Sequence, residues 1–169
     1  MRIIVFALLP SWGLGNAAAT MVGQNLGAGK PERAERSVWI AAFYNMGFLG
    51  AVGLVFVIFA EPILRLFTQD PRIIPYGVAC LRFVSCGFLF YANGMVMSQA
   101  FNGAGDTFTP TMMNLFCFWL WEIPLAYTLA YRLEFGPRGV FAAITVAFST
   151  LAVVGILLFR RGSWKKRKV

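Results

Sequence analysis

The sequence contains no histidine and little charge of either sign. Only 13% of its 169 residues are charged, whereas 59% are hydrophobic and the mean hydropathy is +0.68. Because about a quarter of the residues in a soluble domain are charged, this composition argues against a soluble protein. Cys80, Cys86 and Cys117 all lie inside apolar segments, without the spacing of a metal site or a disulfide framework. We therefore expect no metal site and no cofactor.

The apolar segments also lack the groups that enzymes use. An intramembrane hydrolase would need a paired acid, a metal cluster or a serine beside a base. No such combination occurs at helical spacing in this sequence. We therefore do not expect an enzyme.

What the sequence has instead is long apolar runs. Five of them predict transmembrane helices at about residues 3–22, 37–60, 73–101, 107–131 and 139–159. At about 1.5 Å per residue, each can cross roughly 30 Å of hydrocarbon, which predicts an all-α membrane protein. A signal peptide over residues 1–19 is the alternative for the first run, but Pro10 and Gly13 interrupt it and the apolar character continues to Val22.

The net charge of +8 raises the question of a nucleic-acid partner. Six of the 15 basic residues, however, lie within residues 160–169, directly after an apolar run. Such a segment is typical of a cytoplasmic tail that anchors a membrane protein. We therefore expect no nucleic acid, a multi-pass protein of the inner (cytoplasmic) cell membrane, a lipid bilayer as partner, and a cytoplasmic C-terminus. The loop at residues 24–36 and the turn at residues 102–106 then lie on the same side as the tail.

One carboxylate, Glu122, lies deep within the fourth apolar run. A lone acid at this depth is costly in lipid, so it should face protein or a watery cavity. Helical rise puts Glu122 and Arg82, on the third run, both about 14 Å from the outer end of their helices. Three interpretations follow: a static ion pair, an ion-coupling site that changes its charge during transport, or a placement of Glu122 toward lipid or at the membrane interface.

Several other residues in these runs are candidates for lining a cavity. They are Tyr91, Asn93, Asn114, Trp121 and Tyr127. The aromatic rings could contact an organic cation, although such rings more often face lipid, and a membrane asparagine more often joins helices by hydrogen bonds. Helix breakers within the runs, Pro10, Gly13, Gly15 and Pro124, are candidate hinges, with simple packing kinks as the alternative.

Two stretches carry a resemblance to a known family. Residues 16–37 read NAAATMVGQNLGAGKPERAERS, and residues 94–127 read GMVMSQAFNGAGDTFTPTMMNLFCFWLWEIPLAY. Together they resemble the multidrug and toxic compound extrusion (MATE) transporters, which have twelve helices in two lobes and export drugs or organic cations in exchange for protons or sodium. The resemblance implies that residues 1–159 form a partial C-terminal lobe, corresponding to the last five helices. It also implies that residues 160–169 form the basic tail, that Met1 is an internal or truncated start, and that the partner is a missing N-terminal lobe.

The sequence departs from the family pattern at one position that matters for ion coupling. Many members carry an acid on the tenth helix, whereas the matching residues 90–94 here read FYANG. The usual ion site therefore cannot be carried over. Glu122, on the equivalent of the eleventh helix, departs from that pattern, and the family's other common acid of this lobe, on the seventh helix, falls outside this chain. Glu122 and Arg82 stay the candidates for ion coupling. The alternatives to a drug exporter are a lipid-linked precursor flippase of the same superfamily, and a truncated fragment or accessory membrane protein without transport activity of its own.

Overall fold

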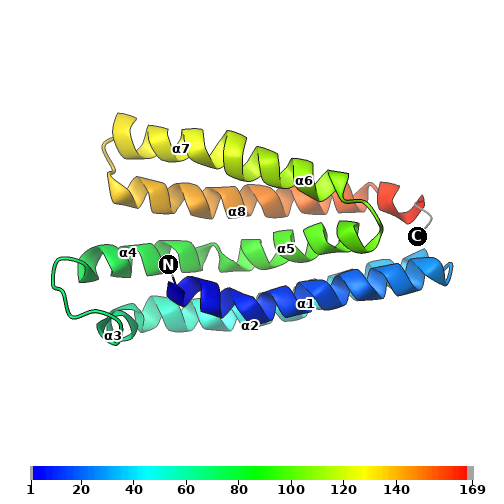
Figure 1. Ribbon diagram of the computed structural model, residues 1–169, viewed down its shortest axis with the longest axis horizontal. Coiled ribbons are helices and arrows are strands. Elements are labelled where there is room, and N and C mark those ends of the chain that lie inside the picture. The colour runs from blue at the N-terminus through cyan, green and yellow to red at the C-terminus, as the bar shows by residue number, and fades with distance from the viewer. Residues whose placement is uncertain (1, 167–169) are drawn as a thin grey trace.

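The computed structural model describes residues 2–166, and within them the protein consists of helices and their connections, without strands (Figure 1). The long helices are α1 (Arg2–Gly27), α2 (Pro31–Ile58) and α8 (Pro137–Arg160). The shorter ones are α3 (Ala60–Arg65), α4 (Ile74–Cys86), α5 (Phe88–Gly103), α6 (Phe108–Asn114) and α7 (Ile123–Tyr127). Two π-helical segments, η1 (Leu115–Glu122) and η2 (Thr128–Arg132), and a 3-10 turn, η3 (Ser163–Lys166), complete the chain.

The five predicted apolar runs all correspond to helical structure. α1, α2 and α8 are each long and apolar enough to cross a membrane, and α4 with α5 forms a bent fourth span. α6, η1, α7 and η2 follow one another without interruption, so the run at 107–131 forms one helical rod. The all-α membrane fold is therefore confirmed. Several boundaries differ, since α1 extends to Gly27 and α2 already begins at Pro31.

The helices pack in layers (Figure 1). The rod lies along α8, α8 lies next to α4 and α5, and α1 and α2 pack against α5 from the other side. The α1–α2 loop, the α5–α6 turn and the end of α8 lie at one end of the bundle, as the sequence predicted. We call this end the basic end.

The single helix predicted over residues 73–101 is wrong, because the chain bends by 53° between α4 and α5. Gly87 lies at the bend, where an added Cβ would be 3.1 Å from the Phe148 ring and 3.4 Å from Thr145 Cα of α8. The Thr145 hydroxyl also donates a hydrogen bond of 2.8 Å to the Phe83 carbonyl oxygen. α8 thus satisfies a backbone group next to the bend, which is how broken helices are tolerated in membranes.

The expected break in the first span is also wrong, since α1 continues through Pro10. Small residues let α1 approach α5 closely instead. A Cβ on Gly15 would lie 3.2 Å from Gln99 Cγ, and one on Gly103 would lie 2.2 Å from the Ala19 carbonyl oxygen. Such small-residue contacts are a common basis of helix association in membranes.

Part of the predicted basic tail, residues 163–166, forms the turn η3, which packs against the bundle. Trp164 is fully buried, its ring stacks on Phe159 with centroids 4.7 Å apart, and its Nε1 donates to the Phe159 carbonyl oxygen. Lys165 forms an ion pair with Glu35 of α2. This turn therefore closes the basic end of the bundle, while residues 167–169 of the predicted tail lie outside the described residues.

Candidate functional site: a polar groove and a half-buried carboxylate

A groove of about 170 Å³ lies between α5, α6 and α8. Its lining residues are Tyr91, Met95, Ser98, Gln99 and Asn102 from α5, Pro110 and Asn114 from the rod, and Leu151 from α8. The structure therefore brings together two of the predicted lining residues, Tyr91 and Asn114. The groove offers hydroxyl and amide groups, and no charged side chain of the described chain lines it.

Tyr91 joins three helices beside the groove. Its hydroxyl accepts a hydrogen bond of 3.1 Å from Trp12 Nε1 of α1. Its ring packs against the Phe148 ring of α8, with centroids 4.7 Å apart. Trp12 is 47% exposed, so an indole face remains accessible next to Tyr91. The sequence did not single out Trp12, because nothing local links two residues that are 79 positions apart.

The polar side chains of the groove are only partly satisfied by the protein. Ser98 donates to the Gly94 carbonyl oxygen at 2.9 Å, and Asn102 Nδ2 donates to Gln99 Oε1 at 3.0 Å. The Asn114 side chain has no hydrogen bond within residues 2–166. Its amide is therefore free to bind a ligand or water. Ser98, Gln99 and Asn102 were missed, although residues 91, 95, 98 and 102 share one helical face and could have been found by that spacing.

Glu122 ends the π-helical segment η1 and is half-buried. It falls on the less exposed stripe of the rod with Met113 and Cys117, which are both buried. Its carboxylate has neither a hydrogen bond nor an ion pair with any residue that the structure describes. π-Helical turns are rare and often occur at functional sites, so this is an unusual backbone for the only acid of the rod.

The predicted ion pair between Glu122 and Arg82 is wrong. Arg82 is exposed on α4, and its Nε donates to the Val57 carbonyl oxygen of α2 at 3.3 Å. α8 lies between α4 and the rod (Figure 1), so matching depth does not bring the two charges together. Glu122 is therefore not neutralised by a neighbouring guanidinium.

Comparison with known proteins identifies the family. The family model described as MatE matches residues 1–128. The chain belongs to the MATE family. A curated relative, the probable multidrug resistance protein NorM of Thermotoga maritima, is 27% identical over 163 residues, which cover 96% of this chain and 35% of that protein. The MATE chain described here thus spans about a third of the length of such relatives.

Solved MATE structures share its fold. An outward-facing multidrug resistance MATE family transporter matches with a TM-score of 0.91 and 25% identity, over 99% of this chain and 38% of that one. An inward-facing MATE family transporter matches with a TM-score of 0.90 and 24% identity, over 99% of this chain and 39% of that one. The MATE transporter ClbM in complex with Rb⁺ matches with a TM-score of 0.91 and 23% identity, over 99% and 40%.

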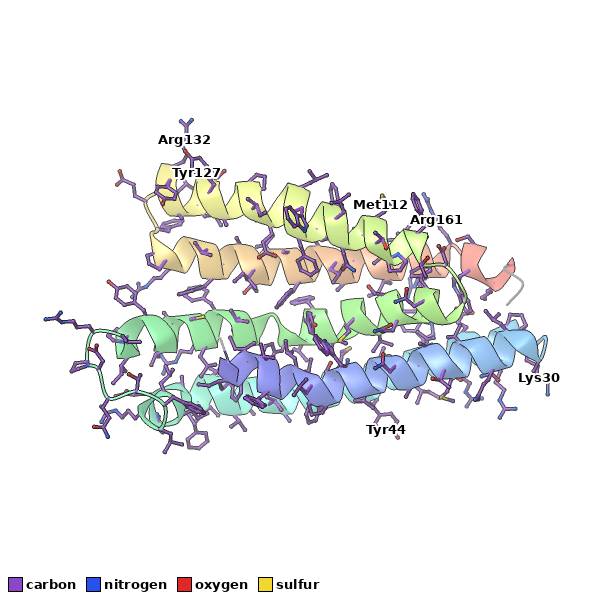
Figure 2. The ribbon with its side chains drawn as sticks, in the orientation of Figure 1. Lys30, Tyr44, Met112, Tyr127, Arg132 and Arg161 are labelled. Carbon is purple, nitrogen blue, oxygen red and sulfur yellow. The ribbon has the colours of Figure 1, made fainter. Side chains whose placement is uncertain are left out.

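Three predicted lining residues of this MATE chain lie outside the groove. Asn93 Nδ2 donates to Met46 Sδ of α2 at 2.7 Å, so this amide faces a helix interface. Trp121 and Tyr127 are 42% and 59% exposed on the rod, and Tyr127 packs against Tyr131 with centroids 5.3 Å apart. Figure 2 shows Tyr127 near Arg132, at the opposite end of the bundle from Lys30. These aromatic side chains fit the alternative of a lipid-facing belt.

The candidate hinges differ in their surroundings. A Cβ on Gly13 would meet nothing within 4 Å, whereas Gly15 packs closely against α5. Pro124 is the second residue of α7, which follows η1 directly. Gly87, which the sequence did not single out, lies at the one bend of more than 40° found between consecutive span-forming helices in the described chain. Movement at any of these residues stays a prediction.

Proposed function

We propose that this chain forms most of the C-terminal lobe of a two-lobed exporter, which exchanges drugs or organic cations for protons or sodium ions. The observation that supports this most is that one arrangement of helices matches an outward-facing and an inward-facing transporter equally well. Such a match is expected of a lobe that keeps its internal packing while it turns against another lobe, as in alternating access. The activity then belongs to the complete two-lobed protein.

The groove between α5, α6 and α8 would form one wall of the substrate cavity. At about 170 Å³ it is smaller than the roughly 300–1,000 Å³ of most drug-sized sites, so a second lobe would have to complete it. The accessible faces of Trp12 and Tyr91 suit an organic cation, because aromatic rings attract positive charge. The uncharged amides of Gln99, Asn102 and Asn114 would orient the polar groups of a substrate.

Glu122 would couple ion movement to export. A carboxylate without a cationic partner can bind a proton or Na⁺ and release it when its surroundings change, whereas an ion-paired one is held in one state. That a MATE transporter of the same fold is known in complex with Rb⁺ supports a role for monovalent cations in this family. Arg82, which contacts the α2 backbone, would not take part directly.

Charge sets the proposed orientation. Arg33, Arg36, Arg160 and Arg161 lie at the basic end, and cytoplasmic segments of membrane proteins carry an excess of such residues. The protein would therefore lie in the inner (cytoplasmic) cell membrane, with its basic end facing the cytoplasm.

A chimera tests this proposal. The chain replaces the matching segment of the Thermotoga maritima relative, and ethidium efflux is measured in bacterial cells that lack their own exporters. We expect efflux well above that of cells with an empty vector. A chimera that reaches the membrane at the level of the parent but exports no ethidium would contradict drug export. Translocation of a fluorescent lipid in place of ethidium would favour the flippase alternative.

A further inference from the structure

A second hollow, away from the polar groove, lies on the outer side of α8 at the basic end. Its volume is about 470 Å³, and its lining residues are Val154, Leu157, Leu158, Arg160 and Arg161. We call these five residues the α8 basic edge. Leu157 is 60% exposed, and residues 154, 157, 158 and 161 share one helical face. The hollow therefore combines an apolar strip with two guanidinium groups at its end.

The structure holds Arg160 in place. Its guanidinium lies over the Trp39 ring of α2, 5.8 Å from the centroid. Phe159 beside it is buried between Trp39 and Trp164, and Lys165 is already paired with Glu35. Because the end of α8 is fixed in this way, Arg160 loses little further freedom when it binds an anion.

The charges of the edge are not neutralised by the protein. Neither Arg160 nor Arg161 forms an ion pair within residues 2–166. Figure 2 shows Arg161 where α8 ends, at the same end of the bundle as Lys30. Since α8 is long enough to span a membrane, its last turn lies at the depth of lipid headgroups.

We propose that the α8 basic edge binds an anionic glycerophospholipid. The guanidinium groups would donate paired hydrogen bonds to the lipid phosphate, and the acyl chain would lie along Val154, Leu157 and Leu158. Basic pockets at the ends of spanning helices recognise such headgroups. A free phosphate ion would leave the apolar strip unused, and a zwitterionic lipid would leave the net positive charge uncompensated. This site is independent of transport.

Native mass spectrometry of the full chain, released from detergent with phosphatidylglycerol or phosphatidylcholine, tests the proposal. We expect the chain to retain more phosphatidylglycerol than phosphatidylcholine. The double variant Arg160→Gln/Arg161→Gln should bind it roughly tenfold to thirtyfold more weakly, and Arg160→Lys/Arg161→Lys should keep part of the affinity. The matched control, Arg132→Gln/Arg138→Gln, removes the same charge at the other end and should bind like the wild type.

The proposal would be overturned by equal retention of the two lipids, by an unchanged affinity of the double glutamine variant, or by an equal loss of affinity in the control. Displacement of the lipid by inorganic phosphate alone would also overturn it, because the acyl chain would then contribute nothing. If the double variant does not fold, Arg161→Gln provides the test, since the Arg161 guanidinium has no partner in the described chain.

Discussion

Several polar side chains inside the bundle connect one helix to another, whereas most of the serine and threonine hydroxyls bond to the carbonyl four residues back in their own helix. Asn45 is fully buried, and its Nδ2 donates to the Ala92 carbonyl oxygen at 3.1 Å. Asn93 contacts Met46 in the same interface, and Tyr91 bonds to Trp12. Glu122 differs, because it has no such partner in residues 2–166. At the scale of residues, the asparagines and tyrosine named here therefore help to hold helices together, and an unpartnered acid such as Glu122 is a candidate for function.

The Trp12–Tyr91 hydrogen bond gives a prediction at this scale. We expect the variants Trp12→Phe and Tyr91→Phe each to lower the free energy of unfolding. The double variant should lose less stability than the sum of the two single losses. The coupling energy should be about 0.6 kcal/mol, the average for such bonds in membranes. A double-mutant cycle of unfolding in mixed micelles measures it. A coupling energy of zero would mean that the bond does not contribute to stability.

At the scale of helices, close contacts determine which substitutions the bundle tolerates. Gly103→Ala should destabilise the chain by about 1–3 kcal/mol or more, because the new Cβ would lie 2.2 Å from the Ala19 carbonyl oxygen and push α1 away from α5. Gly13→Ala is the matched control. It has open space and should be neutral or stabilise α1 by up to about 1 kcal/mol. Melting temperatures in detergent would compare the two, and equal values would contradict the packing described here.

The bend between α4 and α5 depends on a side chain of another helix. Thr145→Val removes the hydroxyl that reaches the Phe83 carbonyl oxygen but keeps the shape of the side chain. We expect a loss of about 0.6–1.7 kcal/mol and faster amide exchange around Gly87. In the control Thr150→Val, the lost bond goes to Val146 within α8, so exchange at the bend should not change. Unchanged exchange in both variants would show that α8 does not hold the bend.

At the scale of the whole molecule, the end of the chain completes the bundle. Trp164 is fully buried in the cluster that also contains Ala34, Val38 and Phe159, so α2, α8 and η3 share one core. Trp164→Ala should therefore cost about 3–5 kcal/mol, the usual range for a large aromatic residue in a core. Trp119→Ala is the control. Because Trp119 is 67% exposed, this variant should lose little stability. Similar unfolding midpoints for both variants would contradict the role of the end of the chain.

Much of the fold could be predicted from the sequence, because long apolar runs directly indicate transmembrane helices. The bend at Gly87 could not, since it depends on contacts with α8 that no local pattern reveals. The prediction of an Arg82–Glu122 ion pair was wrong for a related reason. Helical rise gives the depth of a residue in the membrane, but not which neighbouring helix its side chain faces. Of the groove residues, Tyr91 and Asn114 were predicted. The burial of Trp164 could not be predicted, because the basic residues around it are typical of a tail beside the membrane.

The central claim is that one membrane-embedded carboxylate couples ion movement to drug export. The most direct test is drug uptake into proteoliposomes that contain the chimera, driven by a proton or sodium gradient. Glu122→Gln is compared with Glu134→Gln, which lies in the connection between η2 and α8. We expect the wild type and Glu134→Gln to respond to the gradient, and Glu122→Gln to lose roughly 5-fold or more of that response. Wild-type dependence on the gradient in Glu122→Gln would contradict the claim.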